Sequence, residues 1–155
     1  RLALLTAVRE GVIDIIATDH APHTWHEKQQ AYNKAPAGLP LVQHALLSLF
    51  DQVANKHLTL TQVVEKTAHN PAIRYGIAER GFIREGYFAD LVLVDPNSPY
   101  LVEPQNILYQ CQWSPYLNHQ FKASIKSTWV NGSLVFDGQQ VIPQPSSAMR
   151  LNFEK

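Results

Sequence analysis

The sequence has little cysteine, no excess charge of either sign and no long apolar run, and each absence excludes a class of protein. A single cysteine, Cys111, excludes an internal disulfide framework and is typical of a reducing compartment. Lys and Arg together number 13, as do Asp and Glu, so the basic surplus of a nucleic-acid binder is missing. The sequence contains no run of about 18 apolar residues, so it predicts no membrane span. We therefore expect a cytoplasmic protein without nucleic-acid or membrane partners.

What the sequence does contain divides into two parts. The chain of 155 residues is 45% hydrophobic, which is enough to bury a core. Residues 1–76 combine helical patterns with one apolar run, and residues 77–155 carry mainly β patterns. We predict an α/β protein with one domain over residues 1–76 and a second over residues 77–155.

The first part begins with a helix followed by a buried strand. Residues 2–10 have helical spacing, and Gly11 stands where a left-handed residue ends a helix. Residues 13–17 are nearly all apolar, which is typical of a parallel strand covered on both faces. Because one parallel strand cannot form a sheet alone, this part needs more chain or another subunit. We expect the sequence to be incomplete as a folding unit.

The elements that follow are predicted from local signals. Residues 24–38 are polar without a period, so we expect a long loop, and Gly38-Leu39-Pro40 then starts a helix. Thr59 and Gln62 form a capping-box pattern for a second helix, and Asn70-Pro71 can cap and open a third. The remaining expectations are a strand at 90–95, an irregular or edge-like stretch at 96–121, a hairpin through Asn131-Gly132 and a loosely ordered tail after Pro143.

The segment TDHAPH at residues 18–23 is the clearest candidate site. It places a carboxylate and two imidazoles directly after the predicted buried strand, where α/β folds collect catalytic groups. Carboxylate oxygens and imidazole nitrogens are metal ligands, and a carboxylate beside a metal-activated water can accept and return a proton. Alternatively, Asp19 caps the following turn and the histidines are polar loop residues. The spacing alone leaves both interpretations open.

Five segments in order resemble one family. They are IIATDHAPH at 15–23, KAPAGLP at 34–40, TAHNPA at 67–72, GYFADLV at 86–92 and WVNG at 129–132. Together they span most of the chain, and they resemble the dihydroorotases among the cyclic amidohydrolases. The segment GLPLVQH at 38–44 departs from the Gly-Leu-Glu-Thr of many bacterial members.

The resemblance implies a fold and an activity. It implies that residues 1–76 are the last strand and helices of a metal-dependent (β/α)₈ barrel. Residues 77–155 would then be the C-terminal part of a small composite β-sandwich and a tail. The implied reaction is the reversible hydrolysis of dihydroorotate to N-carbamoyl-L-aspartate in pyrimidine synthesis, in a homodimer with two zinc ions per site.

The resemblance also assigns roles to single residues. Asp19 matches the family's zinc ligand and proton shuttle, and His23 matches the residue that contacts the substrate carboxylate. Ala35 and Gly38 match backbone positions that touch the substrate. A second interpretation of His23 is that its ring only stiffens the Pro22 loop.

The family's other metal ligands do not occur in this chain. The His-x-His pair, the bridging lysine and two further histidines have no counterpart here, and one carboxylate rarely holds zinc by itself. We therefore predict that the isolated chain is inactive and does not bind zinc tightly.

Two other kinds of protein remain open. One is a related cyclic amidohydrolase, such as an allantoinase or a dihydropyrimidinase. The other is a non-catalytic dihydroorotase-like scaffold subunit, against which the retention of Asp19 and His23 argues.

Several further polar and aromatic residues are expected to be structural. We expect His20 to point away from Asp19 if the backbone stays extended. His26 and Glu27 are expected on a solvated loop. The expected structural residues elsewhere are His44, packed or capped near a helix start, His69 in a turn, and Trp113 in packing.

Overall fold

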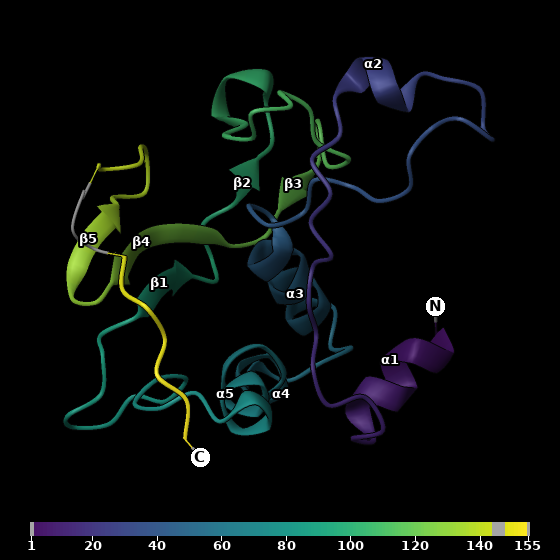
Figure 1. Cartoon of the computed structure of the whole chain (residues 1–155). Helices are drawn as coiled ribbons and strands as arrows, with labels where there is room; N and C mark the ends of the chain where they lie inside the picture. Colours follow the sequence, from purple (N-terminus) through teal and green to yellow (C-terminus); the bar gives the residue numbers. More distant parts are fainter. Residues whose placement is uncertain (1, 144–147, 155) are drawn as a thin grey trace.

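The computed structural model describes residues 2–143 and 148–154 and has a mixed α/β architecture (Figure 1). The α-helices are α1 (Leu2–Arg9), α2 (Trp25–Lys28), α3 (Ala45–Ala54), α4 (Leu60–Val64) and α5 (Asn70–Tyr75). A π-helical turn, η1 (Glu65–His69), and a 3₁₀ turn, η2 (Pro104–Asn106), add to these. The strands are β1 (Leu91–Asp95), β2 (Tyr100–Leu101), β3 (Gln120–Phe121), β4 (Ser124–Val130) and β5 (Ser133–Phe136). No helix among the described residues is long and apolar enough to cross a membrane.

The chain begins as predicted and then departs from the prediction. Helix α1 ends before Gly11, which has a φ of +77°. Residues 13–17 form an extended segment in Figure 1, but within the described residues they pair with no strand. The Ile16 amide in this segment donates a hydrogen bond to the Lys66 carbonyl at 3.0 Å. The segment is therefore extended but unpaired here, and its place as a parallel strand of a sheet stays a prediction, because a strand needs neighbouring strands to satisfy its backbone.

The expected loop at 24–38 contains the short helix α2. The Thr24 hydroxyl accepts from the Glu27 amide at 3.3 Å, and the Glu27 carboxylate accepts from the Thr24 amide at 2.7 Å. This is a complete capping box, in which each side chain satisfies the other residue's free amide. The predicted long loop therefore contains one helical turn, and Glu27 belongs to it rather than to irregular chain, because the Thr-x-x-Glu pattern closes a capping box.

Helix α3 begins at Ala45, five residues after Pro40 where the sequence predicted a start. Residues 41–44 form a turn whose amides are bonded by side chains from other segments, as described for the site below. The helix α4 start is confirmed: the Thr59 hydroxyl accepts from the Gln62 amide at 3.1 Å, and the Gln62 side chain accepts from the Thr59 amide at 2.9 Å.

The predicted separate helix at Asn70-Pro71 is instead the continuation of α4. The chain passes through the π-helical turn η1 into α5 without a break in helical backbone angles. Asn70 does not cap a helix, and its side-chain amide donates to the Asp14 carbonyl at 2.8 Å. The stop at Gly76 is confirmed, with a φ of +61° in the left-handed region.

The second part is built on antiparallel strands, and β1 confirms the strand predicted at 90–95. The larger sheet has the order β1-β4-β5, with Leu91 opposite Trp129, and β2 pairs with β3 as a short separate ribbon (Figure 1). Between β4 and β5, Asn131 and Gly132 have φ values of +49° and +80°, which confirms the predicted Asn-Gly turn.

A buried arginine joins this turn to the start of β1. The Arg80 guanidinium pairs with the Asp90 carboxylate and donates to the Asn131 side-chain oxygen at 2.6 Å. Asp90 also accepts from the Asn131 amide at 2.8 Å, and Arg80 lies 4.2 Å from the centre of the Phe88 ring. These contacts fix the hairpin end against residues 88–90.

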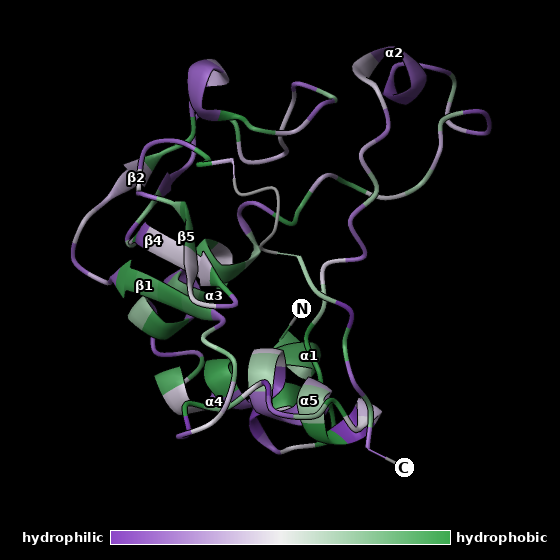
Figure 2. Ribbon diagram, turned by 60° about the vertical axis from the view of Figure 1, so that its left-hand side comes forward, coloured by the Kyte–Doolittle hydropathy of each residue, from purple (hydrophilic) through white to green (hydrophobic). Residues whose placement is uncertain are grey.

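Two clusters of buried side chains form the core, and α3 contributes to both. The ribbons of α1 and β1, which flank the two clusters, are largely hydrophobic in Figure 2. The first contains Leu47, Val102, Phe121 and Ala123. The second contains Val8, Leu58 and Val63, with Leu46 and Leu49 of α3 packed against it. Because the first cluster combines residues from both sides of position 76, helix α3 is shared between the two parts. The domain boundary at 76/77 stays a prediction.

The tail is more ordered near its end than the sequence suggested. Residues 144–147 lie outside the described residues. Beyond them the Glu154 amide donates to the Gly76 carbonyl at 2.7 Å, and the Ala78 amide donates to the Asn152 carbonyl at 2.9 Å. Loose order after Pro143 is therefore wrong for residues 152–154.

His44 is the most deeply buried ionisable residue of the core. Its side chain is fully buried, with its ring 5.8 Å from that of Phe121, as expected for a packed residue. Its Nδ1 lies 3.3 Å from both the Tyr109 hydroxyl and the Ser114 hydroxyl. Burial lowers the pKa of His44 from 6.5 to about 4, because the interior disfavours the charged ring.

This burial predicts a pH dependence of stability. Between pH 4 and 6.5 the unfolded protein binds a proton that folded His44 excludes, so the free energy of unfolding rises with pH in this window and levels off above it. Across this window the titration of His44 changes the free energy of unfolding by a total on the order of 3 kcal/mol. Urea unfolding of His44→Gln, which removes the titrating ring, should lack this part of the slope. An unchanged slope would contradict the assignment.

Candidate active site

Asp19 lies exposed at the end of the extended segment, where the backbone turns. Its φ of +45° is uncommon for a residue other than glycine, although aspartate tolerates it better than most. Within the described part of the chain its carboxylate makes no hydrogen bond or ion pair. A strained backbone and an uncommitted carboxylate are typical of functional positions. The interpretation of Asp19 as a turn cap has no support among these contacts.

His20 is structural. Its Nδ1 accepts hydrogen bonds from the amides of Leu41 at 3.1 Å and Val42 at 3.3 Å, so the neutral ring carries its proton on Nε2. The backbone of His20 forms a parallel bridge with Leu39. This residue therefore attaches the motif to the turn that precedes α3, and its ring is committed to that turn.

A third amide of this turn, that of Gln43, is bonded by the side chain of Tyr109. The Gln43 amide donates to the Tyr109 hydroxyl at 3.0 Å, and the Tyr109 ring lies 5.3 Å from that of His20. Burial raises the pKa of Tyr109 to about 12, so the hydroxyl stays protonated and can donate to His44. Side chains far apart in sequence thus satisfy the amides of residues 41–43, which explains the late start of α3.

Gly38 lies directly against the motif. Its φ is +89°, and a Cβ added there would be 2.5 Å from the Cβ of Ala21. The Ala21 amide donates to the Leu39 carbonyl at 3.0 Å, which holds the two segments at this spacing. Gly38 is therefore placed next to the motif, and its contact with a substrate stays a prediction. Ala35 lies earlier in the same loop, with its amide bonded to the Ala31 carbonyl at 2.9 Å.

Lys28 is a residue of the site that sequence reasoning missed. Its ammonium donates to the Pro36 carbonyl at 2.6 Å and to the Gly38 carbonyl at 3.0 Å. The last residue of α2 thereby closes the loop at residues 29–38 over eight and ten positions. No periodic signal marks such a contact, although the capping box of α2 would have indicated that Lys28 is on an ordered element.

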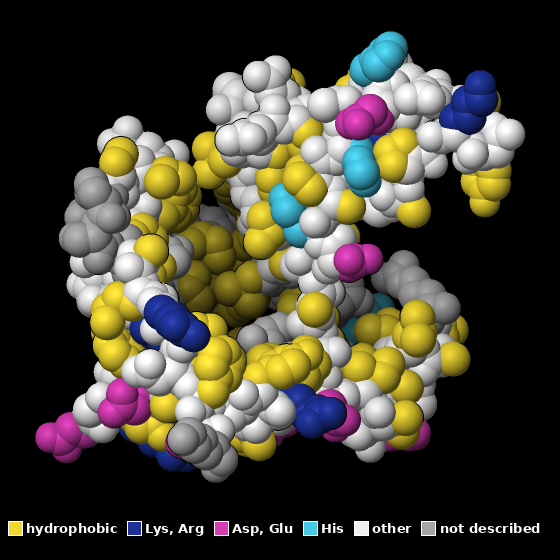
Figure 3. All heavy atoms as spheres, viewed as in Figure 1, with side chains coloured by type: hydrophobic (Ala, Val, Ile, Leu, Met, Phe, Trp, Pro, Cys, Tyr) yellow, Lys and Arg dark blue, Asp and Glu magenta, His cyan; other side chains and the backbone are white. Residues whose placement is uncertain are grey.

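His23 is held by its backbone and leaves its ring uncommitted. Its amide donates to the Ala21 carbonyl at 3.0 Å, and its carbonyl accepts from the Trp113 indole nitrogen at 2.7 Å. The imidazole makes no hydrogen bond to the rest of the described chain, so the loop is stiffened without it. In Figure 3, histidine side chains gather beside α2 and the extended segment leading to it. The hydrogen bonds from Thr24 lower the pKa of the nearby Glu27 carboxyl, and His23 contributes less.

Metal ligands do not converge in the described part of this chain. Among residues 2–143 and 148–154, no group of three or more His, Cys, Asp or Glu side chains could hold a metal ion. Asp19 alone does not form a metal site. Of the two nearby histidines, His20 uses its Nδ1 to accept backbone amides, and His23 does not join Asp19 in a group of three ligands. The prediction of zinc therefore depends on ligands outside the chain.

An apolar cavity adjoins the motif. Its volume is about 320 Å³, and Ile16, Ala17 and Thr18 line it together with Leu46 and Leu49 of α3. In Figure 3 this face of the molecule is hollowed, with hydrophobic side chains on the floor of the hollow. The extended segment that leads to Asp19 thus has an uncovered apolar flank.

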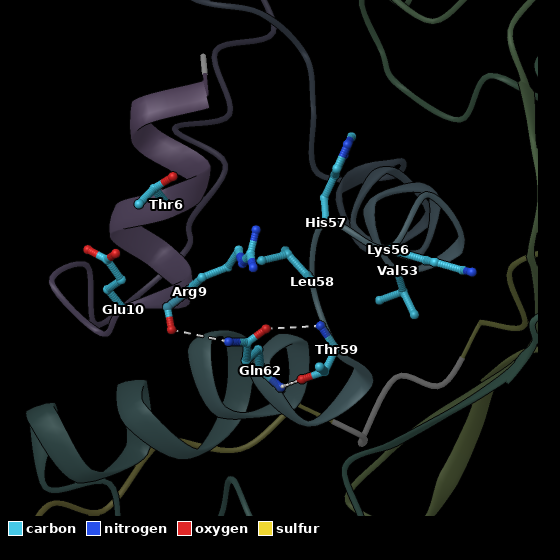
Figure 4. A pocket seen from close by; sticks show the side chains of 9 residues that line it. All are labelled: Thr6, Arg9, Glu10, Val53, Lys56, His57, Leu58, Thr59 and Gln62. Atoms are coloured by element: carbon cyan, nitrogen blue, oxygen red, sulfur yellow. Dashed lines mark hydrogen bonds between the residues drawn. The ribbon is translucent and has the colours of Figure 1, made fainter.

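A larger cavity of about 760 Å³ lies elsewhere, between α1 and the ends of α3 and α4 (Figure 4). Arg9 and Glu10 lie on its α1 side, and Lys56 and His57 lie on its α3 side. The Gln62 side chain joins the helices by donating to the Arg9 carbonyl at 3.3 Å. None of residues 19–23 lines this cavity, so it is separate from the candidate site.

Comparison with known families decides the relationship. The model of the amidohydrolase family matches residues 1–135. This chain belongs to the amidohydrolase family. The resemblance inferred from its motifs is therefore confirmed at the level of the family.

Two curated relatives of this chain are both named dihydroorotase. A dihydroorotase of Clostridium acetobutylicum is 35% identical over 138 residues, which are 88% of this chain and 32% of that protein. A dihydroorotase of Halobacterium salinarum is 39% identical over 143 residues, 91% of this chain and 33% of that protein. The chain thus spans about a third of the length of these relatives.

Two solved structures with a similar fold are named hydantoinase (dihydropyrimidinase). A D-hydantoinase (dihydropyrimidinase) from Thermus sp. superposes with a TM-score of 0.83 at 21% identity, over 92% of this chain and 32% of that chain. An L-hydantoinase (dihydropyrimidinase) from Arthrobacter aurescens gives a TM-score of 0.80 at 25% identity, over 91% and 32% respectively. These likenesses support the mixed α/β amidohydrolase fold.

The contact between Gly38 and the motif predicts the effect of a single methyl group. Gly38→Ala should lower the free energy of unfolding by about 2 kcal/mol or more, because left-handed strain adds to a steric clash with Ala21. Gly86→Ala is a matched control, with a φ of +83° and nothing within 4 Å of the added Cβ. Thermal unfolding of both variants checks this, and an equal loss in the two would show that the contact contributes nothing.

Proposed function

We propose that the full-length protein containing this chain is a zinc-dependent dihydroorotase, which reversibly hydrolyses dihydroorotate to N-carbamoyl-L-aspartate in pyrimidine synthesis. One observation carries the proposal: relatives named dihydroorotase match most of this chain, at 35% and 39% identity, through the segment that contains Asp19 and His23. The free side chains of both residues support it.

In this proposal Asp19 is the catalytic residue. Its exposed carboxylate can take a proton from the attacking water and return it to the leaving ring nitrogen. A carboxylate oxygen is also a ligand that zinc uses, and the remaining ligands would come from chain outside these residues. Zinc bound there would polarise the scissile amide and lower the pKa of water.

His23 would recognise the substrate. Dihydroorotate carries a carboxylate that dihydrouracil and hydantoin lack, and an imidazole N–H can give it a charge-assisted hydrogen bond. The uncommitted ring of His23 supports this role. The backbone at Gly38 and Ala35 would contact the substrate on the other side, where Lys28 holds the loop.

We extend the proposal to the architecture of the full-length protein. The unpaired segment at residues 13–17 would be the last strand of a (β/α)₈ barrel, and the apolar cavity of about 320 Å³ beside it supports missing neighbours. The sheet β1-β4-β5 would belong to a small β-sandwich. A cytoplasmic homodimer stays a prediction, as does the inactivity of the isolated chain.

A second candidate is a hydantoinase or dihydropyrimidinase, which the names of the structural neighbours favour. Their identity to this chain, 21% and 25%, is lower than that of the dihydroorotases. An uncharged ring would give the free imidazole of His23 no anion to bind. A non-catalytic scaffold would use neither Asp19 nor His23.

The proposal predicts a substrate pattern for the full-length protein. It should turn over dihydroorotate but neither allantoin nor dihydrouracil, and Asp19→Asn should reduce the dihydroorotate rate by about 10³-fold, since general acid–base catalysis contributes 10²–10⁴-fold. Steady-state assays with the zinc-loaded protein measure both.

The controls are the zinc content and the melting temperature of Asp19→Asn, which separate loss of proton transfer from loss of the metal or of the fold. Preferred turnover of dihydrouracil would favour the second candidate, and near-normal rates for Asp19→Asn would refute the proton-transfer role.

A further inference from the structure

A segment of the β-rich part reaches the candidate site from far along the chain. Tyr109 packs against His20 with ring centres 5.3 Å apart, and Trp113 donates its indole N–H to the His23 carbonyl at 2.7 Å. The second contact joins residues 90 positions apart and is partly buried. Residues 109–113 therefore contact both histidines that flank Ala21-Pro22.

We propose that Trp113 is a positioning residue for His23, and that it sets the direction in which the His23 imidazole meets an anionic substrate. This inference rests on the proposed function only for the identity of the substrate. The Trp113–His23 hydrogen bond itself is a property of the fold.

The backbone of His23 is fixed at both of its polar groups. Its amide donates to Ala21 at 3.0 Å and its carbonyl accepts from Trp113 at 2.7 Å. With the peptide planes on either side held, only the two side-chain torsions of His23 remain free. Without the Trp113 bond, the peptide between His23 and Thr24 would be held only by the bond from the Thr24 amide to the Glu27 carboxylate, at 2.7 Å. The Cα–Cβ bond of His23, which sets the direction of the ring, would then be less firmly held.

Trp113 is itself held in place by the segment that follows His23. Its ring lies 5.5 Å from that of Trp25, at an angle of 57°, and Trp25 is the first residue of α2. The capping box of Thr24 fixes the start of α2 in turn. His23, Thr24, Trp25 and Trp113 thus form a closed ring of covalent, hydrogen-bond and aromatic links.

The described contacts of Trp113 are with the protein itself. Its only N–H is used by His23, and its ring faces Trp25. The expectation that Trp113 packs is compatible with these contacts, but packing leaves out the hydrogen bond that gives this residue a role in the site.

The test uses Trp113→Phe in the full-length, zinc-loaded protein, which keeps an aromatic ring and removes the donor. We expect KM for dihydroorotate to rise about three- to tenfold, because a hydrogen bond contributes about 0.5–1.5 kcal/mol. The value of kcat should stay within about twofold, since Asp19 is untouched. Trp129→Phe, in β4 on the hairpin, is the control and should change neither constant. An unchanged KM for Trp113→Phe would overturn the proposal.

A double-mutant cycle separates positioning from general damage. In a His23→Ala protein the ring that Trp113 orients is gone, so Trp113→Phe should then change kcat/KM by less than about twofold. If Trp113→Phe costs the same factor with and without His23, its effect does not pass through His23 and the proposal is wrong.

A measurement that needs no substrate keeps the hydrogen bond testable. In ¹⁵N-labelled protein, the indole N–H signal removed by Trp113→Phe should exchange with solvent at least about tenfold more slowly than that of Trp25, whose side chain is 54% exposed. Exchange as fast as that of Trp25 would refute the bond. If the wild-type protein fails to hydrolyse dihydroorotate while the Trp113 signal is protected, the proposed function is wrong and the link to His23 stands.

Discussion

The candidate site depends on the hydrogen bonds by which Nδ1 of His20 accepts the amides of Leu41 and Val42. They attach the end of the extended segment to the turn before α3, and they satisfy amides that no helical carbonyl can reach. The bond from the Ala21 amide to Leu39 and the close contact of Ala21 with Gly38 follow from that attachment. If His20 lost these bonds, the Ala21–Leu39 backbone bond alone would hold the motif against this turn.

Because of this attachment, the ionisable side chains of the motif fall into two groups. His20 is turned toward the fold and uses its Nδ1 there, whereas the side chains of Asp19 and His23 make no hydrogen bond or ion pair to the rest of the described chain. Two uncommitted ionisable groups, held on a backbone that is itself fixed, form a preorganised arrangement for a ligand. Lys28 and Trp113 complete this arrangement by holding the loop and the His23 carbonyl.

The sequence predicted the elements whose causes are local. The Thr59 capping box, the Gly11 and Gly76 stops and the Asn131-Gly132 turn each depend on a few neighbouring residues, and all are confirmed. The segment at 13–17 is extended but pairs with no strand among the described residues, so its place in a parallel sheet stays a prediction. The Lys28, Arg80 and Trp113 contacts span 8 to 90 positions and leave no periodic trace, so no pattern could indicate them. The roles of Asp19 and His23 came from a family resemblance, and the contacts of the structure are compatible with them.

The central claim is that Asp19 carries the chemistry and His23 the recognition of one anionic substrate. Calorimetry of the full-length Asp19→Asn protein, in which turnover is blocked, tests it most directly by comparing dihydroorotate binding with and without a second change, His23→Ala. The claim predicts that Kd for dihydroorotate rises about tenfold or more, the loss of a charge-assisted hydrogen bond, while Kd for uncharged dihydrouracil changes less than about twofold. An equal Kd for dihydroorotate in the two proteins would contradict it.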